Sequence, residues 1–444
     1  MSSSISKTLL QQIEAEYNND KSSIAMRHAL QKTDIQEAAG VQEAMGSLQS
    51  YFSIDIRTLP ATNQQRTGRC WIFSALNMLR EKTARDLNLD RFEFSQNYTA
   101  FWDKLEKSNF FLESILELQD RSWDDRTLAW INRQGIGDGG QWDMFTAITQ
   151  KYGLVPKDAM PETYASSNTR TLTSLMNRRL RRFAADIKQV RDKSEQKAMK
   201  EHCLSEIYGM LCTSFGVPPK TFDFEYVDRD KQYHSVRNLT PSSFYEQFVG
   251  VNLDDYISLI HSPRVETPYH KLYTVKFLGN VKGKPVRYLN VPIEELKEAV
   301  LSQLKDDTVV WFGCDCGKFG DRKDGYWAPE AFDFEAVFDV DFSITKEEAL
   351  HTGESAMNHA MLFTGVNLVD NTPTKWKIEN SWGDKVAREG YYVGSDIWFD
   401  RFVYQAVVNK KYLSGKTLAI LDEKPVELEP WDPMGTLAQS KLLR

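Results

Sequence analysis

Three short segments that lie far apart in the sequence carry a cysteine, a histidine and an asparagine that could act together in the chemistry of one thiol. These segments constrain the fold more than any other feature. Cys70 lies in the first segment, His359 lies 289 positions later (359 − 70), and Asn380 follows in the third. A cysteine is a strong nucleophile only as a thiolate, so it needs a nearby imidazole, and the imidazole needs a third group to orient it. A fold that uses these residues together must bring both ends of the chain to one place.

Cys70 is predicted to lie at the start of a helix. The stretch from Trp71 to Glu81 contains neither Pro nor Gly, and its apolar residues Ile72, Ala75, Leu76 and Leu79 recur on one helical face. The free N–H groups and positive dipole end of a helix N-terminus favour an anion, which predicts a lowered pKa for this thiol. Gly68 is expected to let the chain turn tightly into the helix.

His359 is predicted to lie in a β-strand, and Asn380 at the end of another. His359 opens an apolar run in which His359, Met361 and Phe363 alternate onto one face, as in a strand. Asn380 ends the strand-like stretch 376–379 and is followed by the turn-forming residues 381–383. The Asn380 oxygen could orient the imidazole, and Trp382 could shield that hydrogen bond from water.

Gln64 completes the predicted site. It lies six residues before Cys70, and its amide N–H₂ could join the Cys70 backbone N–H in stabilising an oxyanion. Taken singly, a buried Cys is more often a small core residue, and a lone His on an apolar strand is more often structural. Because each part requires the others, we interpret Cys70, His359 and Asn380 as catalytic and Gln64 as part of an oxyanion hole.

The composition fits a globular intracellular protein. The 444 residues can bury a large core, and a net charge of −7 gives no overall attraction to nucleic acid or anionic lipid. The sequence shows no apolar run of membrane-spanning length, and its first residues lack the hydrophobic stretch of a signal peptide. Five cysteines, an odd number, indicate reduced thiols and a cytoplasmic location. Cys314 and Cys316 are interpreted as structural, and we expect neither a metal nor an organic cofactor.

A basic helical segment lies in the middle of the chain. Between Arg170 and Lys200 there are ten Lys or Arg and three Asp or Glu. Apolar residues recur at spacings of four and three, typical of a helix that buries one seam: Leu172, Met176, Leu180, Phe183, Ile187 and Val190. The charged side is ordinarily a solvated face. Alternatively, the segment joins subunits and presents a positive surface.

The motifs resemble those of the bleomycin hydrolase and bacterial aminopeptidase C family of papain-like cysteine peptidases. Residues 67–71, Thr-Gly-Arg-Cys-Trp, correspond to the papain-type signature, and Thr67 stands at the position of its first Cys. The separation of Cys70 from His359 is about twice that of papain, which indicates an insertion. Further resemblances to the family are at 92–96, 101–104, 137–142, 310–315 and 430–435.

The resemblance implies an α+β papain-like fold, with a helical half, a β-barrel-like half and a helical insertion for oligomerisation. We predict five segments: an N-terminal segment packing on the core, a helical half carrying Cys70, an inserted helical arm, a β-rich half carrying His359 and Asn380, and a C-terminal tail in or near the cleft. Their ranges are 1–60, 61–165, 166–220, 221–430 and 431–444.

The resemblance also implies a function and an assembly. The expected activity is that of a cytoplasmic thiol aminopeptidase of broad specificity, acting on peptides with free N-termini through an acyl-enzyme, within a homohexameric ring. In the family, the terminal carboxylate lies in the cleft and pairs with the substrate α-ammonium group. Six residues follow Ala438, where family members commonly end, so we expect the enzyme to trim its tail to about Ala438.

Two alternatives remain open at this stage. An extended tail that leaves the cleft open would give an endopeptidase or oligopeptidase with the same chemistry. A nucleic-acid-binding ring would instead use the basic segment 170–200, although net acidity and the lack of interleaved aromatic residues weigh against it.

Overall fold

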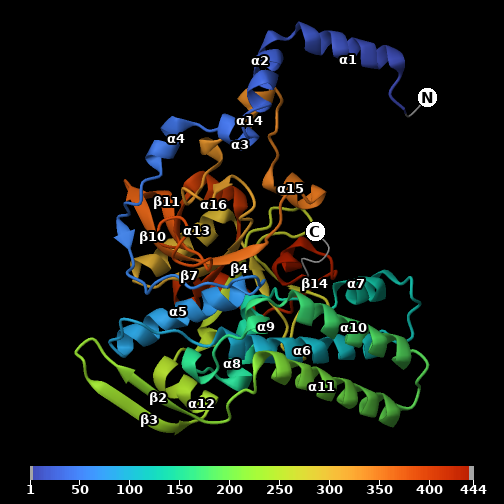
Figure 1. Cartoon of the computed structure of the whole chain (residues 1–444), viewed down its shortest axis with the longest axis vertical. Helices are drawn as coiled ribbons and strands as arrows, with labels where there is room; N and C mark the ends of the chain where they lie inside the picture. The colour runs from blue at the N-terminus through green and yellow to red at the C-terminus, as the bar shows by residue number, and fades with distance from the viewer. Residues whose placement is uncertain (1–3, 440–444) are drawn as a thin grey trace.

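The structure, a computed structural model, describes residues 4–439 of the chain. It contains a helical half and a β-rich half that meet along one long interface (Figure 1). This is the α+β papain-like arrangement that the motifs predict, and a helical insertion extends the helical half.

The helical half is built around the helix that begins with Cys70. Helix α5 covers Cys70–Asp86, so the predicted helix over 71–81 is confirmed and is one turn longer at its C-terminal end. Nearly all of its side chains are buried, because neighbouring helices and the sheet enclose it. The other helices of this half are α6 (Gln96–Glu117), α7 (Arg126–Gln134) and α8 (Trp142–Tyr152).

The insertion forms two long helices that extend the helical half along α6. They are α10 (Arg170–Ile187) and α11 (Lys193–Phe215), preceded by the short α9 (Tyr164–Ser167). The predicted apolar seam is buried along α10 from Leu172 to Ile187. Val190 lies beyond the helix end and is only partly buried against the core.

Many cations of the basic segment have carboxylate partners. Arg179 pairs with Glu206, Arg191 with Asp120, and Lys200 with Glu113. The three carboxylates lie outside residues 170–200, so the local excess of positive charge in the sequence is partly neutralised in the fold.

The β-rich half contains one sheet of twelve strands. Its order is β14-β5-β6-β4-β13-β7-β10-β11-β12-β9-β8, with β1 (Ile54–Asp55) paired to β10. The central antiparallel strands β7 (Val310–Cys314), β10 (His359–Val369) and β11 (Thr372–Glu379) are those nearest the candidate site. The remaining strands are β4 (Tyr256–Ile260), β5 (Lys271–Val275), β6 (Tyr288–Asn290), β8 (Gly320–Asp321), β9 (Tyr326–Trp327), β12 (Tyr391–Ser395), β13 (Val403–Asn409) and β14 (Val426–Leu428).

One pair of strands lies apart from this sheet. Strands β2 (Phe222–Val227) and β3 (Tyr233–Leu239) form a separate hairpin, which projects beside the helical half in Figure 1. Phe224 packs edge-on against Phe92 and Phe244, with ring centroids 6.1 and 5.1 Å away. Aromatic contacts therefore attach the hairpin to the helical side of the molecule.

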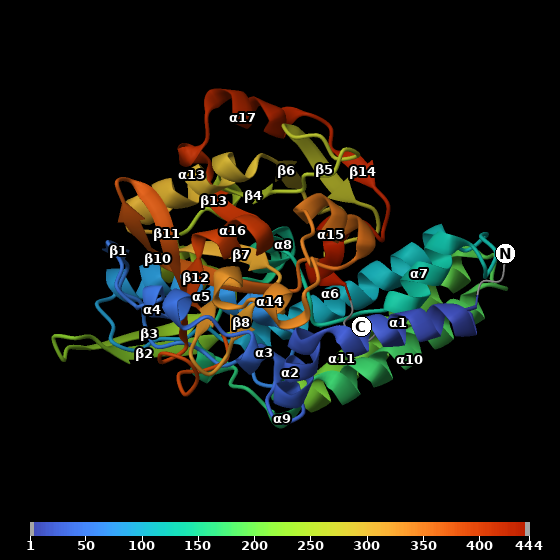
Figure 2. The same ribbon diagram turned by 90° about the horizontal axis from the view of Figure 1, so that it is seen from above.

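Short helices complete the β-rich half. Helix α13 (Ile293–Lys305) packs on the sheet and, as Figure 2 shows, lies on the side away from α5. The others are α14 (Phe334–Phe338), α15 (Lys346–Thr352), α16 (Asp396–Phe402) and α17 (Gly415–Ala419). Helix α12 (Pro241–Phe244) instead lies beside α8 and the β2–β3 hairpin (Figure 1).

The N-terminal segment begins away from the body of the molecule and then packs on the β-rich half, where Ala39 and Leu48 are buried (Figure 1). It contains α1 (Lys7–Asn19), α2 (Lys21–Leu30), α3 (Ile35–Ala38) and α4 (Gln42–Ser47). Helix α1 projects at the top of Figure 1 and all of its side chains are exposed. No helix within residues 4–439 has an apolar stretch long enough to cross a membrane.

Tryptophan side chains fill the interface between the halves. The indole N–H of Trp311 in β7 donates to the backbone carbonyl of Trp71 in α5, at 3.2 Å. Trp142 of α8 packs against Trp311, with ring centroids 6.2 Å apart. These contacts place the first turn of α5 directly against the central strands.

Candidate active site

Cys70 is the first residue of α5 and is almost fully buried. The preceding residue, Arg69, occupies the N-cap position but its side chain does not cap the helix. The Arg69 carbonyl accepts the Ile72 and Phe73 N–H groups, at 3.0 and 3.1 Å. The positive end of the α5 dipole lies at Cys70 and favours an anion there.

Asp138 holds the turn that leads into α5. Its Oδ2 accepts the Gly68 N–H at 3.0 Å and a hydrogen bond from the Thr169 hydroxyl, and its backbone carbonyl accepts the Trp71 indole N–H at 2.7 Å. A Cβ on Gly68 would lie 3.0 Å from the Asp138 Cβ. Glycine at this bend before α5 therefore allows a close approach to Asp138 that a larger side chain would crowd.

A buried lysine keeps Asp138 ionised. Burial alone would raise the pKa of Asp138, but the Lys104 ammonium, 2.7 Å from Oδ1, and the Gly68 N–H hold it well below its usual range. Neither Asp138 nor Lys104 had a role in the sequence prediction. Both lie in stretches that resemble the family motifs, and only their contacts show that they support the Cys70 turn.

His359 begins β10 and is fixed by Asn380. Its Nε2 lies 2.8 Å from Asn380 Oδ1, and both side chains are buried. The Ser381 backbone N–H also donates to that oxygen, at 2.8 Å, which orients the amide. Because Nε2 donates to Asn380, His359 Nδ1 is the nitrogen left for a reacting group.

Trp382 covers the histidine. Its ring stacks on the His359 ring with centroids 5.1 Å apart and an interplanar angle of 27°. The position agrees with the predicted shielding of the His359–Asn380 hydrogen bond from water.

A second contact places α5 beside His359. One turn after Cys70, the Ser74 hydroxyl donates to the Ala360 carbonyl at 3.0 Å. Ala360 adjoins His359, so the N-terminal turns of α5 lie against the start of β10. The fold therefore gathers the predicted thiol, imidazole and amide at one place.

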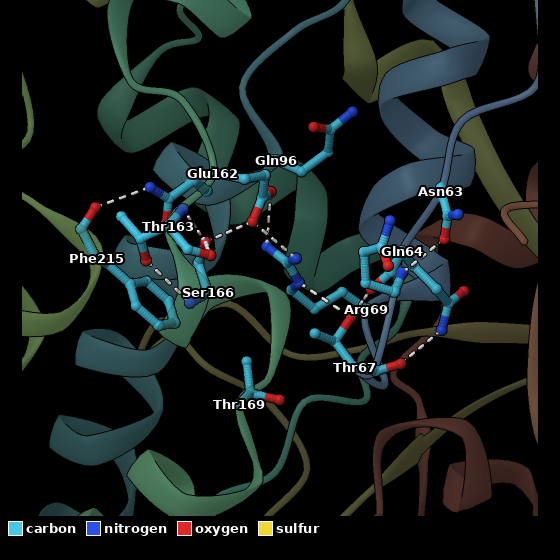
Figure 3. Close-up of polar contacts among 12 residues, drawn as sticks. Asn63, Gln64, Thr67, Arg69, Gln96, Glu162, Thr163, Ser166, Thr169 and Phe215 are labelled. Carbon is cyan, nitrogen blue, oxygen red and sulfur yellow. Dashed lines mark hydrogen bonds and ion pairs between the residues drawn. The ribbon is translucent and has the colours of Figure 1, made fainter. Parts of the chain in front are cut away.

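Gln64 links the loop before Cys70 to the loop after Asn380. Its Oε1 accepts a hydrogen bond from the Ser381 hydroxyl at 2.6 Å, and its Nε2 donates to the Thr67 carbonyl at 2.6 Å. Figure 3 shows this amide beside Thr67. One of the two amide hydrogens is thus used within the loop, and the second is the one that could reach an oxyanion.

Thr67 fits the position where papain-type sequences carry a cysteine. Its hydroxyl donates to the Gln64 carbonyl at 2.6 Å and accepts from Arg69 Nε at 3.2 Å. Arg69 also forms two hydrogen bonds with Glu162, at 3.1 and 3.0 Å (Figure 3). Polar contacts that the sequence did not reveal therefore hold the loop before Cys70 in place.

The described part of the tail crosses between the halves near this site. The 3-10 helix Pro433–Ala438 is bound to the β-rich half because the Thr436 hydroxyl donates to the Met357 carbonyl at 2.8 Å. On the helical side, a Cβ on Gly139 would lie 2.3 Å from the Leu437 carbonyl oxygen. The tail thus lies against both Gly139 and the segment that precedes His359.

Lys107 fixes the glycine loop beneath the tail. Its ammonium donates to the Gly139 carbonyl at 2.6 Å and the Gly137 carbonyl at 3.2 Å, and it pairs with Asp103 at 2.6 Å. Lys104 and Lys107, three residues apart on α6, therefore hold Asp138 and both flanking carbonyls.

Cys314 and Cys316, like the other cysteines within residues 4–439, form no disulfide. Within residues 4–439, no group of three or more His, Cys, Asp or Glu is arranged to hold a metal ion.

Comparison with known proteins identifies the family. Residues 4–435 match the Peptidase C1-like family, and the chain belongs to it. Aminopeptidase C of Lactobacillus delbrueckii subsp. lactis is 45% identical over 419 residues, 93% of each chain. Aminopeptidase C of Listeria innocua is 42% identical over 440 residues, which cover 99% of this chain and 100% of the relative.

A solved structure agrees over the whole chain. The crystal structure of PepW from Lactobacillus rhamnosis superposes with a TM-score of 0.97 at 44% identity, covering 99% of this chain and 100% of that one. The predicted family resemblance and fold class are confirmed.

Replacing Lys104 by Met is expected to destabilise the protein in a pH-dependent way. The buried Asp138 carboxylate would lose its partner, which costs about 3–5 kcal/mol of unfolding free energy at neutral pH. In the wild type the depressed pKa of Asp138 gives stability that is present above the unfolded-state pKa and is lost only as the pH falls toward the folded-state pKa. In Lys104→Met, Asp138 would take up a proton at a higher pH than in the wild type. The difference in unfolding free energy between the two proteins should therefore become smaller as the pH is lowered.

Urea unfolding from about pH 7 down to about pH 4 measures this effect. The control is Lys82→Met, which removes an exposed pair with Asp86 and should change stability by less than about 1 kcal/mol. A loss of unfolding free energy in Lys104→Met that does not change with pH would contradict the assignment of an ionised Asp138.

Proposed function

We propose that the protein is a cysteine aminopeptidase that hydrolyses the N-terminal peptide bond of peptides. The observation that carries the proposal is the His359–Asn380 hydrogen bond beneath Trp382, beside the N-terminus of the Cys70 helix. Full-length similarity to proteins named Aminopeptidase C supports the exopeptidase assignment.

The proposed reaction uses Cys70 and His359 as a thiolate–imidazolium pair. Cys70 Sγ attacks the carbonyl carbon of the first peptide bond, and the Cys70 N–H and the Gln64 amide stabilise the resulting oxyanion. The C–N bond breaks as His359 gives its proton to the departing amine, leaving a thioester. The now neutral His359 then takes a proton from water as the water oxygen attacks the thioester carbon. The C–S bond breaks, which releases the acid product and restores the thiolate–imidazolium pair.

Asn380 and Trp382 keep His359 in place through these steps. Nε2–H remains bonded to Asn380, so proton exchange takes place at Nδ1. A neutral amide suffices as the partner, because the imidazolium already has the thiolate as its counter-charge. Thiolate chemistry supplies its own nucleophile, so the proposed mechanism assigns no step to a metal or organic cofactor.

The tail supports exopeptidase over endopeptidase activity. Its described residues lie against Gly139 and are bound to Met357, two residues before His359. A chain segment there would obstruct a peptide that extends in both directions from the scissile bond. We further propose that trimming to about Ala438 places a terminal carboxylate where it pairs with the substrate α-ammonium group. Residues 440–444, which would be removed, lie outside the described part of the chain.

Hydrolysis of an unblocked aminoacyl fluorogenic amide, compared with its N-acetylated twin under reducing conditions, tests the activity. We expect the unblocked substrate to be cleaved at least about 100-fold faster, since burying an unpaired carboxylate costs several kcal/mol. Cys70→Ala is the blank and should abolish cleavage. Equal or preferred cleavage of the blocked substrate would instead establish an endopeptidase.

Intact-mass analysis tests the trimming of the tail. The purified wild type should lose the residues after about Ala438, whereas Cys70→Ala should keep its full-length mass. Full-length mass in both proteins would contradict self-processing, and equal truncation in both would identify another protease as the cause.

The assembly and location remain proposals as well. We propose a cytoplasmic homohexamer, in which neighbouring subunits cover exposed apolar side chains of the N-terminal segment. Ile5, Leu9 and Ile13 recur every four residues, two of them in α1, and are 73%, 45% and 48% exposed. The pairing of Arg179, Arg191 and Lys200 with carboxylates weakens the alternative of a nucleic-acid-binding ring.

A further inference from the structure

One face of α5 connects the nucleophile to both of the other proposed catalytic residues. Cys70, Ser74 and Asn77 are spaced by four and three residues, so they lie on the same side of the helix. Ser74 binds the Ala360 carbonyl, directly after His359. Asn77 Nδ2 donates to Glu379 Oε1 at 2.7 Å, and Glu379 directly precedes Asn380.

Glu379 is buried among polar groups of α5. Arg80 Nη2 lies 3.3 Å from its Oε1 and also pairs with Glu81 at 2.7 Å. Arg80 is held in turn by the backbone carbonyls of Pro60 and Leu59, at 3.0 and 3.2 Å. The carboxylate of Glu379 thus lies in a fixed polar cluster between β11 and the second and third turns of α5.

Burying the charged groups of this cluster in the protein core is energetically unfavourable. Burial raises the pKa of Glu379 to about 7, against the opposing effect of Arg80, and Glu81 competes for the same guanidinium. Well-packed apolar residues commonly replace a buried ion pair without loss of stability. The retained polar contacts are therefore better explained by the alignment they impose than by the stability they give.

We propose that Glu379 is a positioning residue: its hydrogen bond with Asn77 fixes β11 against α5 and so places Asn380 correctly relative to the Cys70 thiol. This inference rests on the proposed cysteine peptidase function. Strand pairing alone fixes Asn380 relative to His359, because β10 and β11 are neighbours with Leu362 opposite Glu379. The Ser74–Ala360 hydrogen bond links α5 to β10, and the Asn77–Glu379 hydrogen bond extends the alignment of β11, and thus of Asn380, to the same helix.

The test compares Glu379→Ala, Glu379→Gln and Glu81→Ala. For each variant, kcat is measured per reactive thiol, counted by stoichiometric alkylation, beside the melting temperature. Glu379→Ala should lower kcat about 10- to 100-fold, the scale of a misplacement of about 1 Å at a reacting centre. Glu379→Gln keeps an acceptor for Asn77 and should stay within about threefold of the wild type.

Glu81→Ala is the matched control. It removes the other carboxylate bound to Arg80 and should lower the melting temperature, but Glu81 does not adjoin a proposed catalytic residue, so kcat per thiol should be retained. If Glu379→Ala does not fold, Asn77→Ala removes the same hydrogen bond from the opposite side and should lower kcat per thiol similarly.

Two results would overturn the inference. Wild-type kcat per thiol in folded Glu379→Ala or Asn77→Ala would show that the contact is only structural. A Glu379→Gln variant as impaired as Glu379→Ala would show that charge, rather than alignment, is required. Failure of the proposed function is distinguishable, because it would appear in the wild type as absence of Cys70-dependent cleavage.

Discussion

The docking of α5 against strands β10 and β11 is the interaction on which the rest of the site depends. The helix contributes the thiol and the strands contribute the imidazole and amide, and nothing in the local structure of either half joins them. Buried hydrogen bonds from Ser74 and Asn77, with the Trp311–Trp71 contact, fix the two halves to each other. Geometry of this kind must be held within fractions of an ångström for proton transfer and attack to be efficient.

A second set of buried charges shapes the other side of the site. Lys104 and Lys107 extend from consecutive turns of α6 and bind Asp138 and the carbonyls of Gly137 and Gly139. Their contacts fix the turn into Cys70 and the surface on which the tail lies. One rigid helix therefore supports both the nucleophile and the segment proposed to restrict the cleft.

The parts of the site with strong local signals could be predicted from the sequence. Helical periodicity located the start of α5, alternation located the strand of His359, and a turn signal located Asn380 after β11. What could not be predicted depends on contacts between distant residues. The pairing of Asp138 with Lys104, the separate β2–β3 hairpin and the use of one Gln64 amide hydrogen by Thr67 are examples. The catalytic roles themselves stay predictions.

The pH dependence of Cys70 alkylation tests the central claim most directly, because it detects the thiolate without any assumption about the substrate. Iodoacetamide would be reacted with the wild type and with His359→Ala, using Cys70→Ala to subtract the other thiols. We expect rapid alkylation of Cys70 in the wild type well below about pH 8.5, where an ordinary thiol ionises, and loss of that acidic reactivity in His359→Ala. Alkylation that rises only near about pH 8.5 in both proteins would contradict a thiolate–imidazolium pair.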